Sequence, residues 1–294
     1  MAQAIVHHPH SQSTALAGSA LDLLLLEFGV SAMAAGICEL GNLGRATVFA
    51  AVARAGGPFG SEPSRHERWI SVNALAASLR RPFETTRRTA NALIDAGLLA
   101  RSAAGLRLAN AAQADPRTLR FGHACHDLLV RLIDDLRACN VQLPAGRADV
   151  HYDPQVGIGV AFDLFLAAFE CQEGDDRRLM RIALLSAVEW ANKRDHGTGG
   201  TREMPRPVKP SAIARLLGLP YATAARNLDQ MARCGALTRR AGGLILDGAG
   251  GSTSANAELV NRARQLIGRL AQSGFPMHMP SAAYVQSRPR LTLG

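Results

Sequence analysis

The sequence predicts a mainly α-helical protein built from two tandem copies of one module, each closed by a short β-hairpin. The first observation is an internal repeat: residues 71–108 align with 209–246 at a constant offset of 138, and 13 of the 38 paired positions are identical. The second is that apolar residues recur at three- and four-residue steps in both copies, the period of a helix packed on one face. The third is that Pro and Gly recur at the same points, where helices begin and end. One local structure must therefore explain both segments.

Each copy begins with a short helix, a break and a longer helix. The breaks are Arg-Arg-Pro at 80–82 and Gly-Leu-Pro at 218–220, since proline disfavours helix at the preceding residue and fixes φ for a new helix start. The longer helices are expected at about 83–96 and 221–234, each followed by a glycine that accepts the positive φ of a helix end. Strands then pair around the turn glycines Gly105 and Gly243: 98–102 with 106–108, and 236–240 with 244–246.

The longer helices have one apolar and one polar face. Positions at helical spacing are expected to point inward at Thr86, Ala90, Leu93, Ala224, Leu228 and Met231. The residues left pointing outward are Thr85, Arg88 and Asn91 in the first copy, and Thr223, Arg226 and Asn227 in the second.

The duplication extends beyond this segment. An earlier helix at 43–55 corresponds to 180–192, and amphipathic helices follow at about 118–139 and 256–272. We expect a disordered leader (1–17), a first helix and module (18–144), a linker (145–160), a second helix and module (161–280) and a tail (281–294).

Two helices joined by a three-residue turn and followed by a basic hairpin resemble the winged helix-turn-helix domains of bacterial transcription regulators of the MarR, IclR and Crp types. The resemblance covers the whole of each module. It implies that the second helix enters the DNA major groove and that the hairpin, or wing, touches the flanking backbone or minor groove. One departure is Arg81, where the family usually has an apolar residue such as Leu219. We expect either a looser turn there or an Arg81 side chain directed toward phosphate.

The resemblance and the repeated register together give a set of candidate DNA-binding residues. Arg88 and Arg226 are expected to read guanine, because a guanidinium forms two hydrogen bonds to that base. Arg101 and Arg239 are expected at phosphates or the minor groove. For Asn91, Asn227 and Gln230, base contact and a solvated face remain open alternatives. The full set is Thr85, Arg87, Arg88, Asn91, Arg101, Arg107, Thr223, Arg226, Asn227, Gln230, Arg239 and Arg240.

Composition favours a partner that is a polyanion. The net charge is +9, and 31 of the 33 basic residues are Arg, which suits bidentate contacts with guanine or phosphate. Aromatic residues are only 5%, which disfavours a single-strand-binding surface, and Trp69 and Trp190 are expected in the core.

No apolar run is expected to reach the roughly 20 residues of a membrane span, so we expect a cytoplasmic, nucleoid-associated protein. A basic loop of Lys193, Arg194, Arg202, Arg206 and Lys209 would neutralise phosphates.

The sequence contains little that indicates an enzyme or a metal-binding protein. The sequence has no Gly-rich phosphate loop, metalloprotease helix or nucleophile elbow, so we expect no catalysis and no cofactor. His123, Cys125 and His126, with Cys139 and His151 downstream, could suggest a metal site. The second copy has no such histidine pair, and we interpret these residues as members of an amphipathic helix.

The sequence-based conclusion is a sequence-specific, double-stranded DNA-binding transcriptional regulator. One alternative is a plasmid or phage replication initiator or partition factor, and another is a winged-helix scaffold that binds proteins. A homodimer formed through helices 118–139 and 256–272 is a further expectation.

Overall fold

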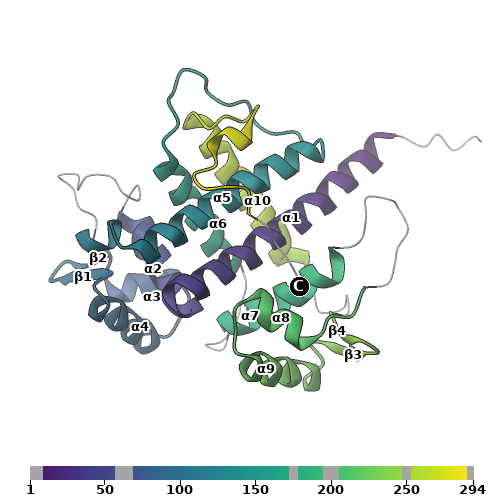
Figure 1. Cartoon of the computed structure of the whole chain (residues 1–294). Coiled ribbons are helices and arrows are strands. Elements are labelled where there is room, and N and C mark those ends of the chain that lie inside the picture. The colour runs from purple at the N-terminus through teal and green to yellow at the C-terminus, as the bar shows by residue number, and fades with distance from the viewer. Residues whose placement is uncertain (1–8, 57–68, 172–177, 195–204, 247–252, 290–294) are drawn as a thin grey trace, which may run out of the picture.

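The computed structural model describes residues 9–56, 69–171, 178–194, 205–246 and 253–289 (Figure 1). These residues are mainly helical and include two short antiparallel hairpins. The expected fold class is confirmed at this level.

The first half contains α1 to α5 and one hairpin. Its elements are α1 (Pro9–Leu40), α2 (Leu43–Gly56), α3 (Val72–Ser78), α4 (Phe83–Asp95), β1 (Leu99–Ser102), β2 (Gly105–Leu108), a 3-10 turn η1 (Asn110–Gln113) and α5 (Pro116–Ala138). The second half repeats this order with α6 (Pro154–Glu170), α7 (Arg178–Lys193), α8 (Pro210–Leu216), α9 (Tyr221–Arg233), β3 (Thr238–Arg240), β4 (Gly243–Ile245) and α10 (Thr253–Gln272), then a turn η2 (Pro280–Ala283).

The turns between α3 and α4 and between α8 and α9 have the same geometry. Arg80 and Gly218 occupy equivalent positions with φ of +48° and +64°, and one backbone bond closes each turn. Arg81 N–H donates to Ala76 O at 2.9 Å, and Leu219 N–H donates to Ala214 O at 2.8 Å. The looser first turn expected from the sequence is therefore wrong.

Each hairpin is joined to a residue that precedes the short helix of its module. Ile70 forms an isolated bridge with Leu106, and Val208 forms the equivalent bridge with Leu244. The turn glycines lie against these bridge residues, because a Cβ on Gly105 would lie 2.5 Å from Ile70 O and one on Gly243 would lie 2.3 Å from Val208 O. Only glycine fits these two positions, which explains its recurrence in both copies.

One hydrophobic core serves both halves. Phe49 and Phe121 from the first half pack on Phe162 from the second, with ring centroids 6.3 Å (Phe49) and 5.1 Å (Phe121) from that of Phe162. The helices α1, α2 and α5 of the first half correspond to α6, α7 and α10 of the second. The contacts between the halves are reciprocal. Helix α1 packs on α7, and the equivalent pair is α6 on α2; helix α5 packs on α6, and the equivalent pair is α10 on α1. Reciprocal contacts of this kind characterise a two-fold dimer, so the single chain has the arrangement of a pseudo-dimer.

The same packing covers the faces that were expected to pair two chains. Leu129 and Ile133 of α5 and Leu266 and Leu270 of α10 are all buried within the chain. A homodimer through these faces would require the core to open.

The segments outside the modules differ from expectation. Helix α1 begins at Pro9, so residues 9–17 are helical rather than part of a disordered leader, whereas residues 1–8 lie outside the described residues. Helix α6 begins at Pro154, inside the expected linker 145–160. The tail is docked as far as residue 289, where Arg131 Nη1 donates to the carbonyl of Pro289 at 2.8 Å.

Helix α1 contains one stretch, Ala20–Leu40, that is long and apolar enough to cross a membrane by length and composition. The expectation that no apolar run approaches this length is therefore wrong. Leu21, Leu25, Phe28 and Met33 of this stretch are buried in the core, where α1 contacts α5, α7 and α2. The apolar character of α1 is accounted for by its position in the middle of the pseudo-dimer.

Candidate nucleic-acid interface

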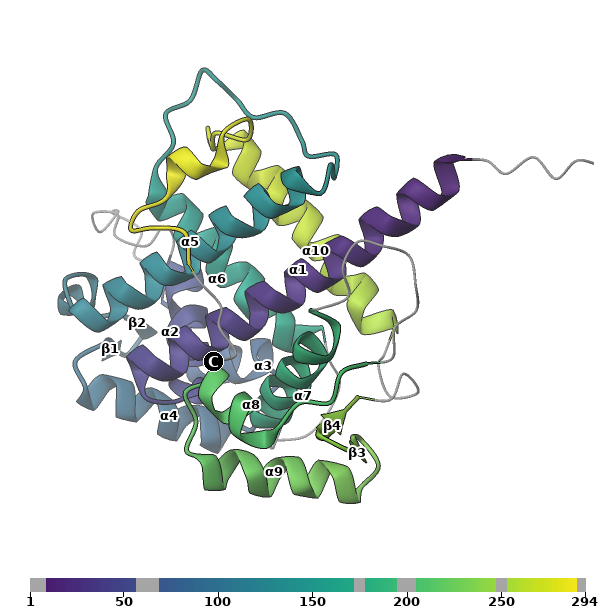
Figure 2. The same ribbon diagram turned by 45° about the vertical axis from the view of Figure 1, so that its right-hand side comes forward.

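Helices α4 and α9 lie along the same edge of the molecule, the lower edge in Figures 1 and 2, and the hairpins lie beside them. Both helices bury the predicted face: Thr86, Ala90 and Leu93 in α4, and Ala224, Leu228 and Met231 in α9. Their opposite faces are turned away from the core. The structure thus brings the two predicted polar surfaces to one side of a single body.

The exposed face of α4 carries an ion-pair cluster centred on Glu84. Its carboxylate accepts hydrogen bonds from Arg87 Nε at 2.8 Å and from Arg88 Nε at 2.9 Å. These two hydrogen bonds lower the pKa of Glu84 from 4.5 to about 2, so the carboxylate is charged throughout the physiological range. Arg88 is still 76% exposed. Sequence reasoning missed Glu84, although its i, i+3 and i, i+4 spacing to the arginines was a visible signal.

The exposed face of α9 has no equivalent cluster. Ala222 stands where α4 has Glu84, and Ala225 stands where α4 has Arg87. Arg226 is exposed and, within the described ranges, has no ion-pair partner. The two faces share Thr and Arg at matching positions but differ in local charge.

A hydrogen bond joins each hairpin to the neighbouring long helix at equivalent positions. Arg101 Nη2 donates to Asn91 Oδ1 at 2.7 Å, and Arg239 Nη2 forms an ion pair with Asp229 Oδ1 at 2.5 Å. Residues 101 and 239 are related by the repeat offset, as are 91 and 229. In both modules this contact links the hairpin to the long helix. Neither the pairing nor the role of Asp229 was anticipated from the sequence.

The other predicted contact residues occupy varied surroundings. Thr85 and Thr223 are half-buried, while Gln230 and Arg240 are exposed. Asn227 donates from Nδ2 to the Thr223 carbonyl at 2.8 Å, so its amide is engaged with its own helix.

Two arginines are turned inward. The Arg107 guanidinium lies 5.1 Å from the centre of the Trp69 ring, and its Nη1 donates to Asn110 Oδ1 at 2.9 Å. The Arg81 side chain lies against the start of α2, where a Cβ on Gly44 would be 3.5 Å from Nη2. The expectation that Arg81 points outward toward phosphate is wrong.

The predicted basic loop is partly described. Lys193 pairs with Glu189 one turn earlier at 2.5 Å, and Arg194 lies over the buried Trp190 at 5.5 Å. Arg206 and Lys209 precede α8, whereas Arg202 lies outside the described residues.

Cys125 and His126 of α5 are buried members of the core. His126 is buried and bonds Asp127 Oδ1 at 3.0 Å and the Tyr152 hydroxyl at 2.8 Å. Burial raises the pKa of the Cys125 thiol far above its usual range. Among the described residues, no group of three or more His, Cys, Asp or Glu side chains is arranged to hold a metal ion.

Asp127 binds the backbone of the segment that follows η2. Its buried carboxylate accepts backbone N–H groups from Val285 and Gln286 at 2.9 Å each and from Ser287 at 3.2 Å. Burial by itself raises the pKa of Asp127, but the hydrogen bonds from His126 and these amides outweigh it and leave the pKa lowered.

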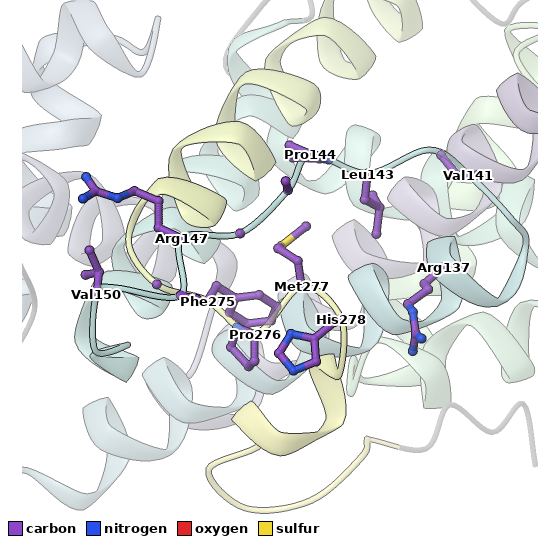
Figure 3. Close-up of a pocket in the computed structure, with 14 residues that line it drawn as sticks. Arg137, Val141, Leu143, Pro144, Arg147, Val150, Phe275, Pro276, Met277 and His278 are labelled. Carbon is purple, nitrogen blue, oxygen red and sulfur yellow. The ribbon is translucent and has the colours of Figure 1, made fainter.

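A hollow of about 620 Å³ lies between the loop that follows α5 and the segment that follows α10 (Figure 3). Apolar side chains such as Leu143 and Met277 line it together with Arg137, Arg147 and His278. Arg147 is paired with Asp149. The hollow is at the upper end in Figure 1, away from α4 and α9.

Comparison of the chain with protein-family models, with curated proteins and with solved structures found no match.

Proposed function

We propose that the chain is a sequence-specific, double-stranded DNA-binding transcriptional regulator composed of two winged helix-turn-helix modules. In this proposal α4 and α9 are the recognition helices and the hairpins are the wings. The observation that carries it is that α4 and α9, which repeat the same Thr and Arg, lie along one edge of a body with one hydrophobic core, with an exposed arginine of the adjacent hairpin beside each helix.

The two-fold relation between the halves supports this function. Dimeric regulators use two-fold symmetry to place recognition helices in major grooves about 34–36 Å, or one helical turn, apart. Here one chain supplies both helices, and reciprocal helix contacts fix their relation. One chain would then occupy a bipartite DNA site.

The chemistry of each surface indicates its role. Arg88 and Arg226 would each read a guanine through two hydrogen bonds. Arg101 and Arg239, at the outer side of each helix, would neutralise phosphates and set the orientation of the module. The cluster around Glu84 partly neutralises α4, so the second module would contribute more of the non-specific attraction to DNA. The net charge of +9 acts in the same direction.

Arginine substitutions test the proposal. Arg88→Ala and Arg226→Ala should each weaken binding to the preferred duplex by about 1–3 kcal/mol and relax specificity at one base pair. Arg239→Ala should weaken binding to all sequences. Arg137→Ala is the matched control, because Arg137 is exposed on α5 beside the distant hollow and its loss should leave affinity nearly unchanged.

The measurement is fluorescence anisotropy with a duplex selected from a random library by the full chain, and with a scrambled duplex. The logarithm of affinity should fall with log salt by about 0.9 for each phosphate neutralised, and about five to ten contacts are expected. Helix variants that bind both duplexes like the wild type would refute the recognition-helix assignment. A flat salt response would favour the protein-binding scaffold.

The proposal includes a cytoplasmic, nucleoid-associated location, since the chain would reside where its DNA is. Fluorescence microscopy of the tagged chain should show it coincident with the nucleoid.

A further inference from the structure

The first residue of each long helix is an exposed aromatic. Phe83 begins α4 and is 47% exposed, and Tyr221 begins α9 and is 60% exposed. The two positions are related by the repeat offset of 138, and each directly follows the proline that starts its helix. Among the described residues, the other large hydrophobic side chains exposed to this degree are Met279 and Val285, in the segment after α10.

These aromatics have no sufficient explanation in the fold. A large apolar side chain at a helix start stabilises the protein when it packs on a neighbouring residue, but Phe83 and Tyr221 each remain about half exposed. Leaving an aromatic exposed forgoes much of the stabilisation that its burial would contribute. An exposed aromatic side chain at the same position of both modules points to a surface that is covered when a partner binds.

We propose that Phe83 and Tyr221 are specificity-determining residues that pack against the C5-methyl group of a thymine, one in each half of the DNA site. This inference rests on the proposed DNA-binding function and adds a base preference to it. The N-terminal residues of a recognition helix are the ones that reach base edges in the major groove. The thymine methyl is the apolar feature that the major groove offers, and Phe is one of the side chains that contact it.

The neighbouring side chains support this position. Arg88 follows Phe83 by five residues and Arg226 follows Tyr221 by five, so the arginine and the aromatic lie within the first two turns of the same helix but about 140° apart around its axis. One exposed end would read a guanine through hydrogen bonds and a thymine through apolar contact. The second copy has no acidic residue equivalent to Glu84. The side chains that both surfaces share are the threonine, the arginine and the aromatic at matching positions.

A pattern in the DNA site follows. The two half-sites should share a thymine and a guanine, because these are read by residues present in both copies. They should differ where the copies differ, at Arg87 against Ala225, Thr89 against Asn227 and Asn91 against Asp229. A 5-methylcytosine should substitute for the shared thymine in part, since it presents the same methyl group.

The test uses the full chain and duplexes selected by it from a random library. Each shared thymine is replaced in turn by deoxyuridine, which removes only the methyl group. Wild-type affinity should fall about four-fold at each such position, the equivalent of one methyl-sized apolar contact of about 0.8 kcal/mol. Phe83→Ala should show a loss of at least this size on the thymine duplex and no additional loss when its thymine becomes uracil. Tyr221→Ala should behave in the same way at the other half-site.

Controls separate this inference from the proposed function. Phe83→Leu keeps an apolar side chain and should retain most of the discrimination between thymine and uracil. Met279→Ala removes an exposed apolar side chain elsewhere and should change no affinity. Thermal melting should show each variant folded, because the replaced rings are exposed.

The outcomes are distinct. If Arg88→Ala and Arg226→Ala weaken binding while the aromatic variants discriminate uracil from thymine as the wild type does, this inference is wrong and the proposed function stands. If the full chain selects no sequence and binds no duplex, the proposed function and this inference both fail.

Discussion

Removing one ring at the boundary between the two halves should destabilise both of them together. Phe162 of α6 is 1% exposed, and its ring packs on Phe49 and Phe121 of the first half at 6.3 and 5.1 Å. Replacing a buried Phe by Ala costs about 3–5 kcal/mol through lost apolar burial and the cavity left behind. With a urea slope of about 3 kcal/mol per M, Phe162→Ala should lower the unfolding midpoint by about 1–1.7 M.

The two tryptophans make the test specific. Trp69 lies in the first module and Trp190 in the second, and the chain has no others. Trp190→Phe leaves a probe of the first module, and Trp69→Phe leaves a probe of the second. Because the core is shared, both probes should report one transition, and Phe162→Ala should shift both by the same amount. Tyr221→Ala, which removes an exposed aromatic, should change stability by less than about 0.5 kcal/mol.

Two transitions, or a shift confined to the Trp190 probe, would refute the shared core. The halves would then behave as separate domains, and the reciprocal contacts could not hold α4 and α9 in a fixed relation.

Two further predictions concern charges. Glu84→Gln should strengthen binding to all duplexes and steepen the dependence of log affinity on log salt by up to about 0.9, because Arg87 is released to neutralise one phosphate; an unchanged slope in anisotropy titrations would show that Glu84 does not hold Arg87 away from phosphate. Asp127→Asn should speed hydrogen exchange of the amides at 285–287, since a charged acceptor is lost, with Asp115→Asn as the control, because Asp115 lies at the start of α5 and pairs with Arg117. Because the pKa of Asp127 is lowered by folding, its stabilisation is complete above the ordinary carboxyl range near pH 4 and is lost as pH falls through the lowered value. Exchange at these amides that is independent of Asp127 would contradict its role in docking the tail.

Much of the fold could be predicted because local signals repeat. Proline and glycine mark the helix starts and ends in both copies, and the helix period identified the buried positions of α4 and α9 correctly. The helices predicted at 43–55 and 180–192 are α2 and α7 within two residues at each end. Two independent copies of the same pattern remove much of the ambiguity that a single short segment has.

The parts that could not be predicted depend on contacts between distant residues. The bridges of Ile70 and Val208 to the hairpins involve single residues and leave no periodic pattern. The inward turn of Arg81 depends on space above Gly44, which only the packing of α2 creates. The full length of α1 was not predicted. This helix is buried on several sides, so it lacks the polar face that marks an amphipathic helix.

The sequence predicted which residues of the candidate site face outward, but it did not predict the contacts between their side chains. The sequence placed Arg88 and Arg226 on outward faces, and both are exposed. It gave no indication that Arg101 contacts Asn91 or that Arg239 contacts Asp229, because side-chain pairing between a hairpin and a helix depends on their relative orientation.

The central claim is that one chain presents two recognition helices to one DNA molecule. Its most direct test is footprinting of the selected duplex combined with the mass of the complex measured by analytical ultracentrifugation. We predict one chain per duplex and two protected major-groove segments, related but unequal, with centres about one helical turn apart. A palindromic site bound by two chains, each protecting only one half through a single module, would contradict the pseudo-dimer and assign the other module to assembly.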